Sequence, residues 1–93
     1  MSKFRSSTRP GFSMTFENGW TISVQWHLGA YCDRKSLSIE PDNNPAESTT
    51  AEIAIWDTQG KWYNFGSDEV LGYQTADQVA KWMEVTKSFK PIK

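Results

Sequence analysis

The chain has 93 residues, with ten Lys and Arg against eleven Asp and Glu and a net charge of -1. This length predicts one domain, and the near-neutral net charge argues against general electrostatic binding to nucleic acid. No stretch approaches the roughly 18 apolar residues that span a bilayer, and the first residues contain no apolar run of signal-peptide length. A single cysteine, Cys32, excludes an intramolecular disulfide, so we expect a cytoplasmic protein.

Charge is unevenly distributed along the chain. Residues 1–10 are rich in Ser, Thr and basic side chains, which predicts a flexible basic arm, followed by a single α+β domain over residues 11–90. The stretch 36–60 contains no basic residue and five acidic ones, which are Glu40, Asp42, Glu47, Glu52 and Asp57. We expect these acids to contribute an acidic surface.

Two alternating segments around Asn18-Gly19 predict a β-hairpin with one apolar face. A two-residue turn would set Phe16 against the polar Thr21, which places apolar and polar side chains on both faces. A three-residue loop at 17–19, with Gly19 in the left-handed region, avoids this conflict. The expected cross-strand pairs are then Phe16 with Trp20, Met14 with Ile22, and Phe12 with Val24.

Residues 51–65 predict a second hairpin, whose turn at 57–60 has Gly60 as its left-handed residue. On one face this register pairs Asp57 with Lys61 as an ion pair, Ile55 with Tyr63, and Ile53 with Phe65. On the other face it sets Trp56 opposite Trp62 and Ala54 beside Asn64. The sheet is therefore expected to be aromatic on both faces.

A C-terminal helix is predicted from about Ala76 to Ser88, because Thr75 can cap it and Gln78 completes a capping box. Its apolar stripe should lie across the sheet, and its length of roughly 20 Å is enough to cover one face of four strands. The expected fold is thus α+β, with two antiparallel hairpins forming a sheet of about four to five strands, packed on one C-terminal helix. The stripe consists of Ala76, Val79, Trp82, Met83 and Thr86.

The predicted helix does not cover the sheet face that bears Trp56 and Trp62. Either the central loop or the N-terminal arm with Phe4 folds over the two indoles, or a ligand or second subunit covers them. We expect a ligand or second subunit.

The central segment 27–50 is long for a connection inside a compact domain, and its residues 36–40 alternate as in a short strand. Its first loop gathers the side chains best suited to binding, whereas the loop 41–50 consists mainly of turn formers and is expected to be solvated. The residues predicted to form a binding site are Trp56, Trp62, Tyr31, Arg34, Lys35 and His27.

The residue inventory specifies no reaction. His27 and Cys32 could approach across a loop, but no nucleophile signature surrounds them, and two potential ligands are too few for structural zinc. The six glycines are isolated, and none belongs to a phosphate-binding loop. We therefore expect no catalytic residue, no metal, no cofactor and no enzymatic activity.

The segment 12–26, together with Tyr31-Cys32, residues 51–57 and Gly60-Lys61-Trp62, resembles small uncharacterised proteins of bacteriophages and prophages. The resemblance covers residues 11 to about 85 and implies an accessory protein in the host cytoplasm, without any known active site. Our leading hypothesis is a non-enzymatic protein that binds a host or phage protein and blocks it. The alternatives are a protein that binds or sequesters a small ligand such as a nucleotide, and a homo-oligomeric structural component.

Overall fold

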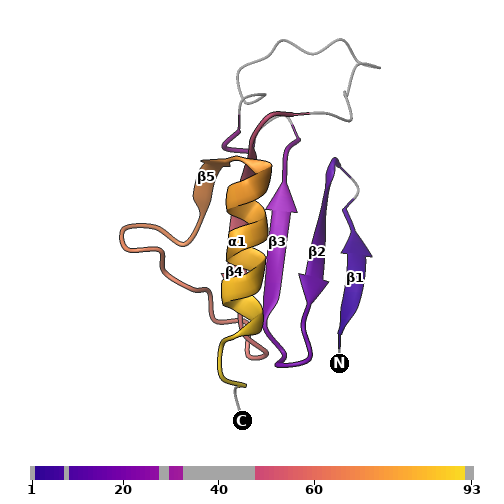
Figure 1. Ribbon diagram of the computed structural model, residues 1–93, viewed down its shortest axis with the longest axis vertical. Helices are drawn as coiled ribbons and strands as arrows, with labels where there is room; N and C mark the ends of the chain where they lie inside the picture. The colour runs from indigo at the N-terminus through magenta and orange to yellow at the C-terminus, as the bar shows by residue number, and fades with distance from the viewer. Residues whose placement is uncertain (1, 8, 28–29, 33–47, 92–93) are drawn as a thin grey trace.

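The computed structural model describes residues 2–7, 9–27, 30–32 and 48–91. They form a five-stranded antiparallel sheet, with the strands in the order β1-β2-β3-β4-β5, and one helix, α1 (Figure 1). The elements are β1 (Lys3–Ser6), β2 (Gly11–Thr15), β3 (Thr21–Gln25), β4 (Ala51–Trp56), β5 (Leu71–Gln74) and α1 (Ala76–Lys87). The α+β fold expected from the sequence is confirmed. The predicted short strand at residues 36–40 lies outside the described residues.

The first hairpin has the predicted register. Its β2–β3 pairs include Phe12 with Val24 and Met14 with Ile22, and the amide of Phe16 donates to the carbonyl of Trp20 at 2.9 Å. Gly19 closes the loop with a φ of 90°. Apolar alternation therefore decided the turn length, because only this register puts the apolar side chains on one face.

The second hairpin follows the prediction only near its turn. Gly60 has the expected positive φ, Tyr63 donates its amide to Ile55, and Trp56 forms a bridge with Trp62. Further along, Ile53 pairs with Leu71 of β5 and not with Phe65, so that part of the predicted register is wrong. The chain leaves the hairpin at this point, where the amide of Phe65 donates to the carbonyl of Asp68 in a turn.

The predicted ion pair between Asp57 and Lys61 is also wrong. These two described side chains do not pair; a carboxylate oxygen of Asp57 accepts from the backbone amides of Gln59 at 2.8 Å and Lys61 at 3.0 Å. Asp57 is buried, so bonds to turn amides satisfy a charge that the interior would otherwise penalise.

The N-terminal segment departs from the expected flexible arm. Residues Lys3–Ser6 form β1 and pair with β2, with Phe4 opposite Met14 and Arg5 opposite Ser13. Side chains directly opposite each other share a face, so Phe4 lies on the same face as the apolar ladder of β2.

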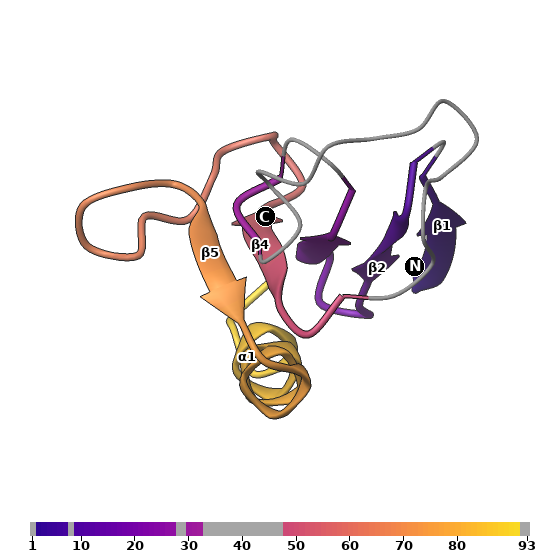
Figure 2. The same ribbon diagram turned by 90° about the horizontal axis from the view of Figure 1, so that it is seen from above.

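Helix α1 begins and ends as the sequence predicts. Thr75 and Gln78 form the capping box, and the C-cap is Ser88. The helix runs along the strands, however, and not across them, and it packs on β3, β4 and β5 from one side (Figures 1 and 2). Because a helix is about 10 Å wide and strands lie about 4.8 Å apart, this orientation covers only part of a five-stranded sheet.

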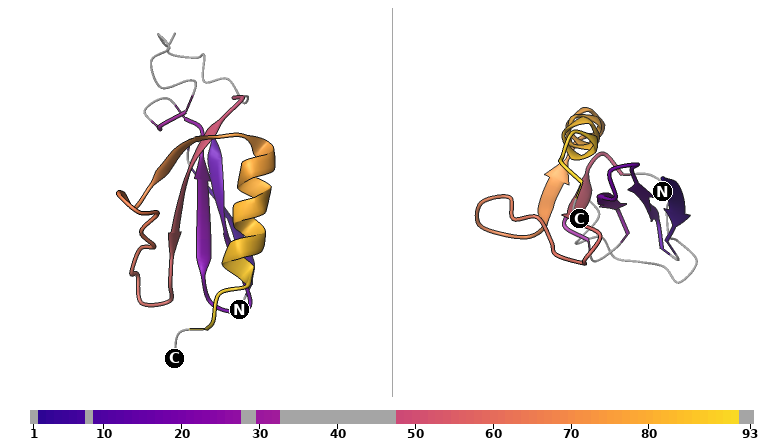
Figure 3. Two further views of the ribbon diagram at one scale, coloured as in Figure 1. Left: turned by 60° about the vertical axis from the view of Figure 1, so that its left-hand side comes forward. Right: turned by 90° about the horizontal axis from the view of Figure 1, so that it is seen from below.

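The core lies between α1 and the central strands. Its fully buried members include Ile22, Ile53 and Ile55, and Val79 contributes from the helix. Around the C-terminal half of α1, Trp82 makes edge contacts with Tyr63 and Phe65, and Phe89 packs on Tyr63. Two views from other directions show α1 on a single side of the sheet (Figure 3).

Candidate functional site

The predicted aromatic pair is formed by β4 and the residues that follow its turn. Trp56 and Trp62 stack with ring centroids 5.3 Å apart and planes inclined by 28°. Trp56 shares a face with Thr21, its β3 partner, and this is the face away from α1. Trp62 is 42% exposed and Trp56 is partly buried. Trp62 is therefore the accessible member of the pair.

Tyr31 lies beside β5. Its carbonyl accepts from the amide of Tyr73 at 2.8 Å, and a Cβ added to Gly72 would lie only 2.6 Å from the Cβ of Tyr31. The Tyr31 side chain is 48% exposed. Tyr73 holds a positive φ of 56°, which is unusual for a residue with a side chain. The Tyr31 backbone thus lies close against β5, and its side chain is about half exposed.

Of the remaining predicted site residues, only His27 lies in the part of the chain that the structure describes. His27 is partly buried, and its carbonyl accepts from the amide of Ala30 at 3.1 Å. Arg34 and Lys35 lie outside the described residues. The buried Cys32 thiol lies 3.8 Å from the carbonyl oxygen of His27, so it is directed at backbone.

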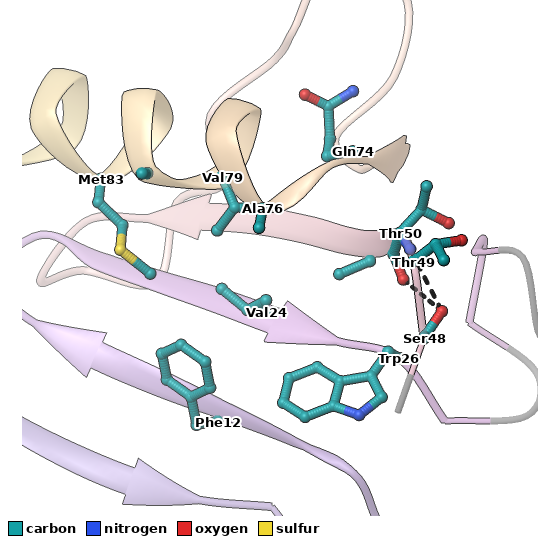
Figure 4. Close-up of a pocket in the computed structure, with 12 residues that line it drawn as sticks. Phe12, Val24, Trp26, Ser48, Thr49, Thr50, Gln74, Ala76, Val79 and Met83 are labelled. Atoms are coloured by element: carbon teal, nitrogen blue, oxygen red, sulfur yellow. Dashed lines mark hydrogen bonds between the residues drawn. The ribbon is translucent and has the colours of Figure 1, made fainter. Parts of the chain in front are cut away.

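A groove between α1 and β2 is the feature that the sequence did not reveal. The part of this groove near the start of α1 is a cavity of about 610 Å³. Met83 and Val79 point into it from the helix, and Phe12 and Trp26 from the sheet side (Figure 4). Phe12 and Trp26 meet edge to face, with ring centroids 6.2 Å apart. The remaining lining residues are Val24, Ser48, Thr49, Thr50, Ala51, Gln74, Ala76 and Ala80. The walls are mainly apolar, and the polar groups gather at one end.

A second hollow of about 480 Å³ continues along the same side of α1. It shares Met83 with the first cavity and has Met14 and Phe16 on the sheet side. Its polar residues are Ser2, Glu17, Asn18, Glu84 and Lys87. Met83 therefore lies at the middle of one elongated apolar groove, for which we keep the name α1–β2 groove.

Phe4 extends this apolar surface to the sheet edge. It is 79% exposed and lies opposite Met14 on the face that α1 partly covers. Solvent-exposed aromatic side chains next to an apolar groove are typical of contact surfaces. The alternation of residues 12–16 correctly identified the face of Met14 and Phe12. It could not show that α1 would leave this part of the face open, because that depends on the direction of the helix.

The described residues contain no cluster of three or more His, Cys, Asp or Glu arranged to hold a metal ion. Within the same ranges, no helix has the length and apolar character needed to cross a membrane. No protein family, curated protein or solved structure matches this chain.

Proposed function

We propose that this chain is a non-enzymatic binding protein that docks an apolar helical segment of a host or phage protein in the α1–β2 groove. The observation that carries the proposal is the placement of α1, which packs on β3, β4 and β5 and leaves the apolar side chains of β2 only partly buried beside the two hollows. The resemblance to bacteriophage and prophage proteins favours a partner in the host cytoplasm. By covering an apolar helix, the protein blocks that partner's own contacts.

The dimensions of the uncovered surface suit one helix. Strands β1 and β2 extend beyond β3 by about 10 Å, given a spacing of about 4.8 Å, and a helix with side chains has about that diameter. A helix laid beside α1 would bury Phe4, Phe12 and Met14 below it and Met83 at its side. Helix-in-groove recognition uses such a surface, with anchors at i, i+3, i+4 and i+7.

A matched pair of substitutions on α1 tests the proposal. Met83→Glu places a charge in the middle of the groove, whereas Val85→Glu makes the same kind of change at an exposed position outside the groove lining. Helical peptides with apolar residues at i, i+3, i+4 and i+7 are selected from a display library against the wild-type protein. We expect Met83→Glu to weaken their binding by about tenfold or more, equivalent to about 1.4 kcal/mol, and Val85→Glu to leave it unchanged.

Phe4→Glu provides a second readout if Met83→Glu disturbs the fold, because Phe4 is largely exposed. Amide chemical shifts recorded with a selected peptide should move at Phe12, Met14 and Met83. Shifts confined to Trp56 and Trp62, or equal binding by all variants, would contradict a site in the groove.

The stacked tryptophans support a second candidate, the binding of a nucleotide. An exposed indole face on Trp62 can take a base in the same stacked geometry that Trp56 already uses. Titration of mono-, di- and cyclic nucleotides against wild type and Trp62→Ala tests it. A saturable fluorescence change in the wild type alone would favour this function, and sedimentation of the free protein would reveal a homo-oligomer.

A further inference from the structure

Strand β1 has an outer edge that no strand of the described chain pairs with, since it is the first in the sheet order. Its inner edge bonds to β2, and beyond the strand the amide of Ser7 donates to the carbonyl of Gly11 at 3.2 Å. Hydrogen-bonded pairs alternate along an antiparallel ladder, so Arg5 and Lys3 also bond inward. The amides and carbonyls of Phe4 and Ser6 consequently point outward, where they can bond to another strand.

The opposite edge of the sheet differs. At β5 the amide of Tyr73 is already taken by the carbonyl of Tyr31. All four residues of β1, in contrast, are exposed. Of the two edges, β1 is the one whose outward backbone groups have no partner among the described residues.

The side chains of β1 indicate what kind of strand would fit. Phe4 lies on the face of the apolar ladder, whereas Lys3 and Arg5 lie on the other face, opposite Thr15 and Ser13. An added strand that alternates acidic and apolar residues would place carboxylates beside the two cations and an apolar side chain beside Phe4. Opposite charges and apolar pairs across strands are both stabilising.

A second copy of this chain fits this edge poorly. If two β1 strands paired antiparallel with Phe4 facing Phe4, Lys3 would lie directly opposite Arg5 of the other copy. In the next antiparallel register, with Phe4 opposite Ser6, Arg5 would lie opposite Arg5 of the other copy. Both registers oppose like charges, and cations on an edge strand are a known device against self-pairing.

We propose that the β1 edge binds an extended acidic segment of another protein by strand addition, with acidic and apolar residues alternating along that segment. This site shares Phe4 with the surface beside the α1–β2 groove but uses the outward backbone groups of β1, so it needs no helical partner. The basic residues of β1 favour acidic partners over basic ones, and Phe4 selects an apolar residue between the acids.

A peptide of alternating Glu and Val, seven residues long with blocked ends, is the probe, and a Lys-Val peptide of the same length is its control. Binding to the full chain is followed by fluorescence anisotropy at low salt. We expect the Glu-Val peptide to bind and the Lys-Val peptide not to bind. The double variant Lys3→Glu/Arg5→Glu should lower the affinity roughly tenfold or more, because it replaces attraction with repulsion.

Ser6→Pro tests the backbone contribution, since it removes an outward amide without removing an inward bond to β2. It should weaken binding, whereas Ser6→Ala should not. Met83→Glu, which disrupts the groove, should leave this peptide's affinity unchanged and so separates the two sites. The proposal is overturned if the Glu-Val peptide does not bind, if both peptides bind equally, if Ser6→Pro binds like wild type, or if wild type dimerises through β1.

Discussion

The side-chain amide of Asn18, in the first hairpin turn, donates a hydrogen bond to the backbone carbonyl of Thr86 in the last turn of α1, at 2.9 Å. The same amide donates to the carbonyl of Phe89, also at 2.9 Å, and the Asn18 oxygen accepts from the amide of Trp20. The last carbonyls of a helix lack partners within the helix. Asn18 therefore shapes its own turn and fastens the end of α1 to it.

Replacing Asn18 with Ala should destabilise the fold by about 1–3 kcal/mol, because three hydrogen bonds are lost and the carbonyl of Phe89 loses its side-chain donor, although Thr86 still accepts from the amide of Phe89. Asn18→Asp should be at least as damaging, since a carboxylate would face the negative end of the helix. Chemical denaturation measures both effects.

Asn64→Ala is the matched control. The Asn64 oxygen bonds only locally, to the amide of Gly66 in an exposed turn. We expect a loss of less than about 1 kcal/mol from it. Equal denaturation midpoints for the Asn18 and Asn64 variants would show that the link between the turn and the helix contributes nothing.

The contact between Asn18 and Thr86 also shows where sequence reasoning ends. Alternation between Phe12 and Trp26 was enough to predict the hairpin register, and the capping box at Thr75 was enough to predict where α1 starts. These signals lie within a few residues of the structure they determine. The partner of Asn18 lies 68 residues away, and no local pattern indicates it.

The α1–β2 groove was missed for a related reason. The helix length was predicted well, but its direction relative to the strands depends on the path from β5 through Thr75. The sequence also suggested that Phe65 would continue the second hairpin, and the turn between Phe65 and Asp68 prevents this. Of the predicted site, only the pairing of Trp56 with Trp62 follows directly from local alternation.

The two turn glycines should respond differently to substitution by Ala. Both have positive φ, 90° at Gly19 and 78° at Gly60, so each substitution should cost about 1 kcal/mol. A Cβ at Gly19 would in addition lie 2.4 Å from the Cγ2 of Thr58. A Cβ at Gly60 would meet no such atom within 4 Å. Gly19→Ala should therefore have the lower melting temperature.

Thr58→Ser, which removes that methyl group, should recover part of the loss in Gly19→Ala and none in Gly60→Ala. Thermal unfolding of the single and double variants measures this coupling. If Gly19→Ala and Gly60→Ala both melt like wild type, the left-handed turn conformations are wrong.

Glu17 links the first turn to the start of β1 and should make the folded state sensitive to acid. The hydroxyl and backbone amide of Ser2 both donate to its carboxylate, and these bonds lower its pKa from the ordinary 4.5. A lowered folded pKa means that the stabilisation is present above pH 4.5 and is lost as the pH falls through the lower, folded value. The effect is modest because Glu17 is exposed.

Carboxyl carbon shifts followed by NMR from pH 7 to 2 should give Glu17 a lower pKa than an unbonded glutamate in a short peptide. Ser2→Ala should raise it toward the ordinary value, because it removes the hydroxyl donor that contributes most to the shift. A Glu17 pKa that is normal in wild type, or unmoved by Ser2→Ala, would contradict the bond to Ser2.

The stacked pair on the face away from α1 yields the last prediction, that another molecule covers Trp62. Stacking gives Trp56 a partner but leaves Trp62 42% exposed, and monomers seldom leave a large aromatic surface uncovered. Trp62→Ala should therefore shift the protein to smaller species in sedimentation, or abolish ligand binding if the wild type is already monomeric. Tyr73→Ala removes a ring at β5 that is 51% exposed and should do neither. If wild type stays monomeric, binds no ligand, and its Trp62 indole is shielded from a paramagnetic probe in solution, the chain itself covers this face.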